Sequence, residues 1–204
     1  KSTVATLILR MTTPSSGEVL IDGTPITGFV PHALREMIGY VPQDSFLFSE
    51  TVKDNIALGL SDDDAARDAR VEEAAENAAF TGEVAELPKQ FDTMLGERGV
   101  NLSGGQKQRA AIARALAKSP KIVVLDDCLS AVDTRTEDRI LSRLKEVSKG
   151  LTLLLIAQRV STVSHADRRL VLARGRIVQQ GTPDELREQP GLYADMARRQ
   201  ELAE

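Results

Sequence analysis

Two short runs in this chain combine residues that could bind a nucleotide. The first, Leu102 to Gln106, places a hydroxyl and two glycines at the start of a predicted helix. Backbone N–H groups bared at a helix start bind anions such as phosphate. The second is an apolar run over 122–125 that ends in the carboxylates of Asp126 and Asp127. An acid at the carboxyl end of a strand lies where open α/β folds bind ligands, and Asp126 is suited to coordinate Mg²⁺.

A third candidate motif lies at the beginning of the chain. Lys1-Ser2-Thr3 matches the last part of a phosphate-binding loop, G-x-x-x-x-G-K-[ST], in which the lysine reaches the β- and γ-phosphates and the hydroxyl holds Mg²⁺. The glycines of that pattern are absent, so these three residues are weak evidence by themselves. We expect Lys1 to be an internal residue of a longer protein whose phosphate loop is cut. Taken singly, the other two runs also have plain structural explanations, a glycine-containing helix cap and an acid that caps a turn.

The elements that must position these residues alternate between strands and helices. Continuous apolar runs at 122–125 and 151–156, separated by a predicted helix over 134–148, are typical of parallel strands buried on both faces. Ser103 is expected to cap a helix that ends at Lys118. Together with a mainly helical stretch before Ser103, this pattern predicts an α/β fold that carries an α-helical lobe.

The remaining elements are predicted from turn residues, caps and periodicity. They are helices over 3–10, 31–37, 52–57, 62–80, 183–188 and 191–202, strands over 17–21 and 38–41, and a hairpin over 170–178, with Thr51 as an N-cap and Gly82 as the stop of the helix over 62–80.

Composition limits the class of protein. The chain has 204 residues, 42% of them apolar, enough to bury a core. Its 26 basic and 30 acidic residues give a net charge of −4, which argues against a nucleic-acid partner. One cysteine, Cys128, excludes an internal disulfide and is interpreted as a packing residue.

The ordered set of motifs resembles the ATP-binding cassette (ABC) ATPases over nearly the whole chain. The motifs are Lys1-Ser2-Thr3, Gln43 after Val41-Pro42, the signature run Leu102 to Gln106, the strand and acid pair 122–127, and the loop 130–133 that ends in Asp133. This resemblance implies a P-loop fold with a mainly parallel sheet covered by helices, whose first strands precede Lys1. It also implies one nucleotide-binding domain over 1–204, with a helical signature sub-domain over about 51–118 and core portions over 1–50 and 119–204.

The resemblance assigns roles to the motif residues, with ATP and Mg²⁺ as cofactors. Ser2, Gln43 and Asp126 would hold the metal, and the remaining nucleotide-binding residues are Lys1, Thr3, Leu102, Ser103, Gly104, Gly105, Gln106 and Asp133. Two such domains close head to tail, so that each ATP lies between one chain's phosphate loop and the other chain's signature.

Two further segments resemble the exporter branch of the family. They are the run from Phe46 to Ile56 and Gly96-Glu97-Arg98-Gly99 just before the signature. In exporters the domain is usually fused behind a transmembrane domain, and the residues corresponding to Gln43 and Glu97 contact its coupling helices. The resemblance therefore implies a second nucleotide-binding domain and a transmembrane domain as partners, at the cytoplasmic face of the membrane.

At two positions this chain departs from the hydrolytic pattern of the family. The residue after the metal-binding acid is Asp127 where hydrolytic members have a glutamate as general base, and Gln158 replaces the histidine that contacts the γ-phosphate. The carboxylate of aspartate is one methylene, roughly 1.5 Å, shorter in reach, and a misplacement of this size can cost about 10²-fold in rate. Together the two changes resemble the degenerate half of a heterodimeric exporter, which binds ATP but hydrolyses it poorly.

Two other interpretations remain open. The first is a homodimeric exporter in which Asp127 works as a slow base. The second is a soluble ABC protein of DNA repair or translation, which is disfavoured because the stretch between Gln43 and Leu102 is too short for coiled-coil arms.

Overall fold

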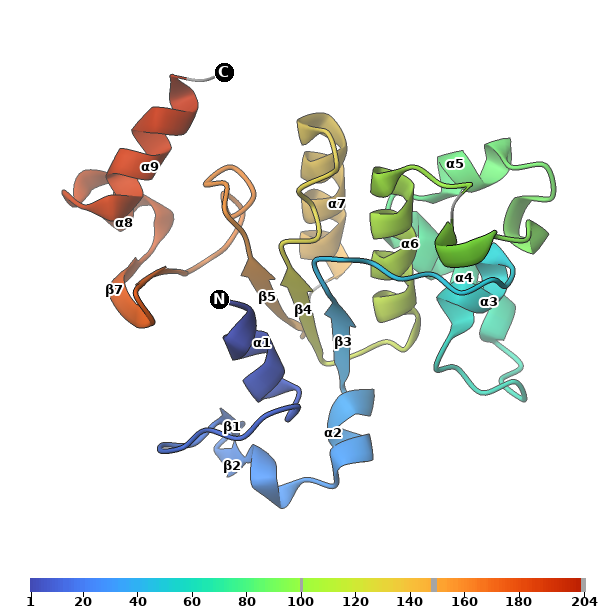
Figure 1. Cartoon of the computed structure of the whole chain (residues 1–204), viewed down its shortest axis with the longest axis horizontal. Helices are drawn as coiled ribbons and strands as arrows, with labels where there is room; N and C mark the ends of the chain where they lie inside the picture. The colour runs from blue at the N-terminus through green and yellow to red at the C-terminus, as the bar shows by residue number, and fades with distance from the viewer. Residues whose placement is uncertain (100, 148–149, 203–204) are drawn as a thin grey trace.

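A three-stranded parallel sheet forms the centre of the computed structural model, which describes residues 1–99, 101–147 and 150–202 (Figure 1). Its strands are β3 (Ile38–Val41), β4 (Ile122–Asp126) and β5 (Thr152–Ile156), in the order β3-β4-β5. Leu125 of β4 lies in register with Val41 on one side and Leu155 on the other. The expectation that the two apolar runs form parallel strands is confirmed. Burial on both faces is observed for β4 and not for β5, which lies at the edge of the sheet with no fully buried residue.

Helices cover both faces of this sheet. On one face Val124 packs with residues of α1 (Ser2–Ile8) and α2 (Pro31–Glu36). On the other face Val123 and Leu125 pack with α6 (Gly104–Ala117) and α7 (Thr134–Val147). Because neighbouring side chains of a strand point to opposite faces, a run with no polar residue is what this two-sided burial requires.

The signature helix α6 is surrounded by smaller helices. These are α3 (Val52–Ala57), α4 (Arg67–Asn77), α5 (Thr81–Glu86) and the 3-10 turns η2 (Gln90–Asp92) and η3 (Glu97–Gly99). Figure 1 shows them gathered beyond α6, on the side away from β5. One apolar cluster runs from the sheet through α6 to α4, so the sub-domain limits near 51 and 118 stay a prediction.

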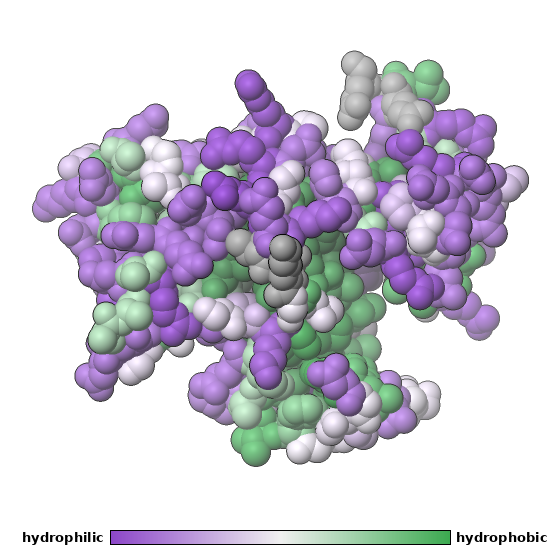
Figure 2. All heavy atoms as spheres, turned by 180° about the vertical axis from the view of Figure 1, so that it is seen from behind, coloured by the Kyte–Doolittle hydropathy of each residue, from purple (hydrophilic) through white to green (hydrophobic). Residues whose placement is uncertain are grey.

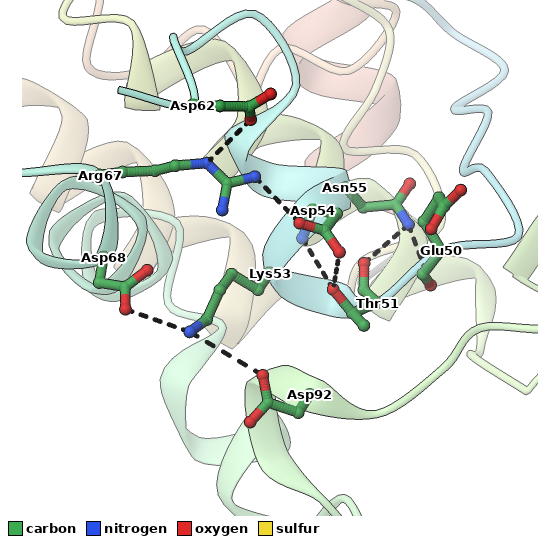
Figure 3. A network of polar contacts seen from close by, with 9 residues as sticks. All are labelled: Glu50, Thr51, Lys53, Asp54, Asn55, Asp62, Arg67, Asp68 and Asp92. Atoms are coloured by element: carbon green, nitrogen blue, oxygen red, sulfur yellow. Dashed lines mark hydrogen bonds and ion pairs between the residues drawn. The ribbon is translucent and has the colours of Figure 1, made fainter. Parts of the chain in front are cut away.

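Charged side chains hold α3 against α4 (Figure 3). Arg67 donates from Nη2 to Oδ1 of Asp54 at 2.9 Å, and Nζ of Lys53 lies 3.2 Å from Oδ2 of Asp68. Thr51 caps α3 as predicted, because its hydroxyl accepts the N–H of Asp54 at 3.0 Å.

Two hairpins and two helices complete the fold. The hairpins are β1 (Leu20–Ile21) with β2 (Thr24–Pro25), followed by the 3-10 turn η1 (Ile26–Gly28), and β6 (Arg169–Ala173) with β7 (Arg176–Gly181); the helices are α8 (Pro183–Glu188) and α9 (Leu192–Glu201). β5 is an edge strand of its sheet, and Leu153 and Leu155 remain partly exposed. Figure 2 shows hydrophobic residues in the middle of the rear face, between more hydrophilic flanks. Within the described ranges, no helix has both the length and the apolar character needed to span a bilayer.

Two predicted elements differ from the structure. The helix expected over 62–80 begins only at Arg67, and its stop is Ala79, not Gly82, which lies inside α5. Ala79 has a left-handed φ of 53°, and Phe80 donates its N–H to the carbonyl of Ala75 at 2.8 Å. This hydrogen-bond pattern is a Schellman motif in which alanine takes the position that is usually glycine. A prediction based on glycine therefore misses this helix end. The strand expected over 17–21 comprises only Leu20 and Ile21, and Ser148, the predicted end of the helix over 134–148, lies outside the described residues.

Candidate functional site

The acid pair lies at the carboxyl end of the central strand. Asp126 ends β4 and is 3% exposed, whereas Asp127 lies just beyond it and is partly exposed. The backbone of Asp127 is left-handed, with a φ of 50°, and its N–H donates to the carbonyl of Ile156 at 2.7 Å. Aspartate tolerates this conformation better than most residues. The turn therefore begins directly after the metal-type acid and remains bound to β5.

Gln158 contacts Asp127 directly. Because β4 and β5 are parallel, their carboxyl ends meet at one edge of the sheet, and Gln158 follows the end of β5 by two residues. Its Nε2 donates to Oδ2 of Asp127 at 2.7 Å. The two residues that depart from the hydrolytic pattern of the family are thus one hydrogen-bonded unit.

The first residue predicted to belong to a phosphate loop lies beside this unit. Nζ of Lys1 donates to the carbonyl of Ala157, the residue before Gln158, at 2.6 Å. Ser2 and Thr3 form the exposed first turn of α1. Three segments far apart in the sequence, which begin at residues 1, 126 and 157, are therefore brought together at one sheet edge.

Gln43 lies at the same edge of the sheet. It follows Val41, the last residue of β3, which is in register with Leu125 beside the acid pair. The side chain of Gln43 is exposed. The sheet topology thus brings this residue to the edge where Asp126 ends the neighbouring strand.

The chemistry of Asp126 fits a magnesium ion. Its carboxylate forms no hydrogen bond or salt bridge with any of the residues that the structure describes. Neither of its oxygens is among the described side-chain atoms that are buried without a partner, so the carboxylate remains open to a ligand. No three His, Cys, Asp or Glu side chains gather into a metal cluster within the described ranges. Mg²⁺ is commonly held by one or two carboxylates, water and substrate phosphates, so a single acid with nearby hydroxyl and amide oxygens suits it.

The start of the signature helix is fixed by its own side chains. The hydroxyl of Ser103 accepts the N–H of Gln106 at 3.2 Å, and Oε1 of Gln106 accepts the N–H of Ser103 at 2.8 Å, which is a capping box. Leu102, the first residue of the signature, is 5% exposed. Sequence reasoning assigned both polar side chains to a nucleotide, whereas here they bond to the helix start. The N–H groups of Gly104 and Gly105 are the ones left to point outward from this turn.

The signature glycines lie against the loop after the acid pair. A Cβ added to Gly105 would stand 3.3 Å from the carbonyl oxygen of Ala131, and one added to Gly104 would stand 3.6 Å from the Cβ of Ala131. The absence of side chains therefore allows this close approach. The signature contacts the loop over 130–133, and the structure does not bring it to Lys1 or to the Asp127–Gln158 unit.

Asp133 ends that loop and is exposed. Its Oδ1 accepts the N–H of Thr136 at 3.0 Å, in the first turn of α7. Hydrogen bonds from Thr136 hold the pKa of the Asp133 carboxyl below its ordinary value. The acid is thus an N-terminal cap of α7 as well as the predicted contact to a second domain.

A buried ion pair behind the site was not predicted. Glu137 of α7 is 1% exposed, and its Oε2 accepts a hydrogen bond from Nη2 of Arg159, which also donates to the carbonyl of Leu129 at 3.2 Å. The pair joins α7, the loop after Asp127 and the segment that carries Gln158. An acid inside an otherwise apolar helical face was the only signal in the sequence.

A cavity of about 220 Å³ adjoins Asp127 and Gln158, between the loop after β4 and the segment after β5. It is smaller than the about 300–1,000 Å³ typical of ligand pockets. The cavity alone is therefore too small for the predicted nucleotide, which we expect over the open sheet edge.

A second surface of interest carries exposed aromatic residues. Phe46 and Phe48, in the loop after Gln43, are 50% and 43% exposed and pack edge to face with ring centres 5.0 Å apart. Met94, which is 56% exposed, lies opposite Thr51 in an isolated bridge. Large apolar side chains that remain in water mark a surface suited to another protein segment.

Comparisons with known proteins agree with this fold. The profile of the family described as ABC transporter matches residues 1–130. The chain is 47% identical over 200 residues to the "ATM1-type heavy metal exporter" of Novosphingobium aromaticivorans, an alignment that covers 98% of this chain and 32% of that protein. It is 45% identical over 202 residues to the "Probable multidrug resistance ABC transporter ATP-binding/permease protein YheI" of Bacillus subtilis, which covers 99% of this chain and 34% of the relative.

A solved structure, of a bacterial Atm1-family ABC exporter with ATP bound, superposes with a TM-score of 0.91 at 46% identity. It covers 98% of this chain and 34% of that one. The fold is therefore the P-loop ABC ATPase fold, and this chain belongs to the ABC transporter family. The expected resemblance and fold class are confirmed, and the Novosphingobium relative and the solved structure carry the name exporter. The chain spans about a third of the length of these relatives.

Proposed function

We propose that this chain is the ATP-binding domain of an ABC exporter whose own composite site binds ATP but hydrolyses it slowly. The observation that carries the proposal is the Asp127–Gln158 unit. Hydrolytic members of the family have glutamate and histidine at these two positions, and here the shorter acid is bonded to a neutral amide at 2.7 Å.

The reach of the acid supports slow hydrolysis. A general base must come within hydrogen-bond distance of the water whose proton it takes. The carboxylate of aspartate stands roughly 1.5 Å further back than that of glutamate, and an error of about 1 Å can cost about 10²-fold in rate. The amide of Gln158 cannot carry a positive charge toward a phosphate, which a protonated histidine can.

In this proposal the chain keeps the residues that bind ATP. Lys1, Ser2 and Thr3 take the phosphates, and Gln43 and Asp126 take Mg²⁺ together with Ser2. Bound Mg²⁺ neutralises phosphate charge and orients the triphosphate. The site thus holds ATP as a clamp between two domains.

A second nucleotide-binding domain completes each site. Leu102, Ser103, Gly104, Gly105 and Gln106 of this chain cover the ATP of the partner, and Asp133 meets the partner in the loop beside them. We infer that the partner is a different chain with glutamate and histidine at its own positions, and that most hydrolysis takes place there. The intact signature of this chain supports this assignment, because the signature completes the site of the partner.

A transmembrane domain is the second partner. We place its coupling helices on the face formed by Gln43, Glu97 and the aromatic pair Phe46 and Phe48, because apolar rings otherwise remain in water. This position sets the domain at the cytoplasmic face of a membrane.

A homodimeric exporter with a slow base is the alternative. Its support is that Asp127 remains partly exposed and has no salt bridge with a described residue, so its carboxylate is able to accept a proton. In that case ATP turnover by homodimers would be lost in Asp127→Ala.

The test is ATP turnover by the full exporter assembled with its partner. When the partner's site is disabled in this assembly, Asp127→Glu combined with Gln158→His is expected to raise the remaining turnover by about tenfold or more, because it restores reach and charge at the reacting water. Asp127→Glu alone is the control for reach. An unchanged turnover in the double variant, or brisk phosphate release from this site while the partner's site is disabled, would contradict the proposal.

A further inference from the structure

A half-buried arginine links the signature helix to the exposed aromatic pair. Arg114 lies in the second half of α6, the helix that begins with the signature. Its Nε donates to the carbonyl of Asn55 at 2.7 Å, and its Nη1 donates to the carbonyl of Phe46 at 2.8 Å. Its guanidinium carbon stands 5.7 Å from the ring centre of Phe48. One side chain thus contacts both residues of the aromatic pair.

Asn55 extends this link to the backbone of Phe48. Its Oδ1 accepts both Nη2 of Arg114 at 2.8 Å and the N–H of Phe48 at 2.8 Å. Its Nδ2 donates to the carbonyl of Phe48 at 3.0 Å. The same amide also donates to the carbonyl of Thr51 at 3.0 Å (Figure 3). The amide of Asn55, which is 2% exposed, therefore holds both backbone polar groups of Phe48.

Among the described residues, the hydrogen-bond partners of Arg114 are neutral. Among the residues that the structure describes, no carboxylate forms a salt bridge with it, and its hydrogen bonds go to carbonyl and amide oxygens. Burial lowers the pKa of its guanidinium to about 10, so the group stays protonated at neutral pH. Because this half-buried cation is held, among the described residues, by carbonyl and amide oxygens and an aromatic ring, losing any of these oxygens leaves its charge less well solvated.

We propose that Arg114 is a positioning residue that fixes Phe46 and Phe48 on the signature helix, so that a movement of α6 moves the surface offered to the transmembrane domain. The inference rests on the proposed function. Its physical basis is the planar fork of arginine, which places several N–H donors on one rigid plane. The signature at the start of α6 and the aromatic pair beside its second half are then two ends of one rigid body.

The test uses the full-length exporter assembled with its partner. Hydrogen exchange of the peptide over 44–50 and substrate-stimulated ATP turnover are measured together in Arg114→Met. Exchange at the Phe48 N–H is expected to rise by about tenfold or more, because its acceptor loses its own anchor. Stimulation of turnover by transported substrate is expected to be lost, while the ATP concentration for half-maximal basal turnover stays unchanged.

Two variants separate positioning from general damage. Arg114→Lys keeps the charge without the fork and should give intermediate exchange and stimulation, and it decides the question if Arg114→Met does not fold. Arg70→Met is the matched control, since Arg70 donates to the carbonyl of Ala117 at 3.1 Å, at the end of the same helix. It should leave both readouts at the wild-type value.

Some outcomes would overturn the inference. Unchanged exchange over 44–50 in folded Arg114→Met, or in Arg114→Lys if Arg114→Met does not fold, would show that the aromatic pair does not depend on this arginine. An equal rise in exchange in Arg70→Met would show a general loosening of α6. The double variant Phe46→Ala, Phe48→Ala distinguishes the two proposals. If it keeps normal coupling, the assigned membrane-domain surface fails, whereas lost coupling with unchanged exchange in Arg114→Met rejects only the positioning role.

Discussion

Gln158 and Asp127 are hydrogen-bonded to each other, with Nε2 of the amide 2.7 Å from Oδ2 of the acid. The bond joins the end of β5 to the turn after β4, next to the backbone bond from Asp127 to the carbonyl of Ile156. Residues in contact do not contribute independently, so substitutions at these two positions are expected to be non-additive. In the proposed function, the pair therefore acts as one unit that replaces the glutamate and histidine of hydrolytic members.

Removing the charge of Asp127 should have a small effect on the exporter. Asparagine is well suited to the left-handed backbone at this position, so Asp127→Asn tests the charge alone. We expect total ATP turnover of the assembled exporter to fall by less than about twofold, because most turnover is assigned to the other site.

The matched control is the corresponding Glu→Gln change in the partner, which should cost on the order of 10²-fold or more. Equal losses in the two variants would mean that Asp127 is itself the principal base.

Exporter turnover should be more sensitive to substitution in the signature than to substitution of Asp127. Ser103→Arg places a large cation at the start of α6, and we expect it to lower exporter turnover more than Asp127→Ala does. The change also removes a helix cap, which is worth about 1 kcal/mol. Thr182→Arg is the control for that loss, since Thr182 caps α8 with the same kind of capping box, formed with Glu185. Comparable turnover in the Ser103 and Thr182 variants would contradict a role of the signature in the partner's site.

The charge network of Figure 3 should make stability depend on acid pH. Hydrogen bonds from Thr51 and Arg67 lower the pKa of the Asp54 carboxyl. A carboxyl with a lowered pKa stabilises the fold above its unfolded pKa of about 3.9, and this contribution is lost as pH falls through the folded pKa. Asp54→Asn should therefore lower the thermal unfolding midpoint at pH 7, and the difference from wild type should shrink below about pH 4.

Asp63→Asn is the control, because it removes a nearby exposed acid from outside the network. A difference for Asp54→Asn that stays constant down to pH 3 would show that the charge is not what stabilises α3.

The sequence predicted the sheet well because its signals are strong and local. The two apolar runs became β4 and β5, and Ser103 caps α6 where the pattern placed it. The predicted end of the helix over 62–80 was wrong because Ala79 takes a left-handed conformation that is normally found at glycine. Local rules of this kind cannot foresee a position that tertiary packing holds in an uncommon backbone region.

The sequence indicated which residues belong to the candidate site, but it did not indicate the contacts between them. Spacing and family resemblance indicated Asp127 and Gln158, but their hydrogen bond depends on the register of β4 and β5. The Glu137–Arg159 pair and the Arg114–Asn55 link join residues 22 and 59 positions apart in the chain. Such side-chain pairs depend on how the helices pack on the sheet, and the periodicity of the sequence does not predict this packing.

Cys128 should be almost unreactive in the folded chain. Burial raises the pKa of its thiol to about 12, with a smaller effect from the neighbouring acids Asp126 and Asp127. Because the thiolate is the reactive form, its fraction at pH 8 is about 10³-fold lower than for a thiol of pKa about 9. Alkylation with iodoacetamide, followed by mass spectrometry, should be slower in the folded chain by at least this factor. Rapid labelling that matches urea-unfolded protein would contradict the packing role of this cysteine.

Glu137 should stabilise the fold more than exposed acids do, because it anchors the segment that carries Gln158. Glu137→Gln leaves the Arg159 guanidinium without its carboxylate. Breaking a buried pair costs about 3–5 kcal/mol, but the Arg159 side chain is 37% exposed, so we expect a loss of about 1–2 kcal/mol in urea unfolding. Glu76→Gln is the matched control, since Glu76 pairs with Arg143 at 3.2 Å on the surface and should change stability by less than about 0.5 kcal/mol. Equal losses in the two variants would show that Glu137 contributes no more to stability than a surface charge does.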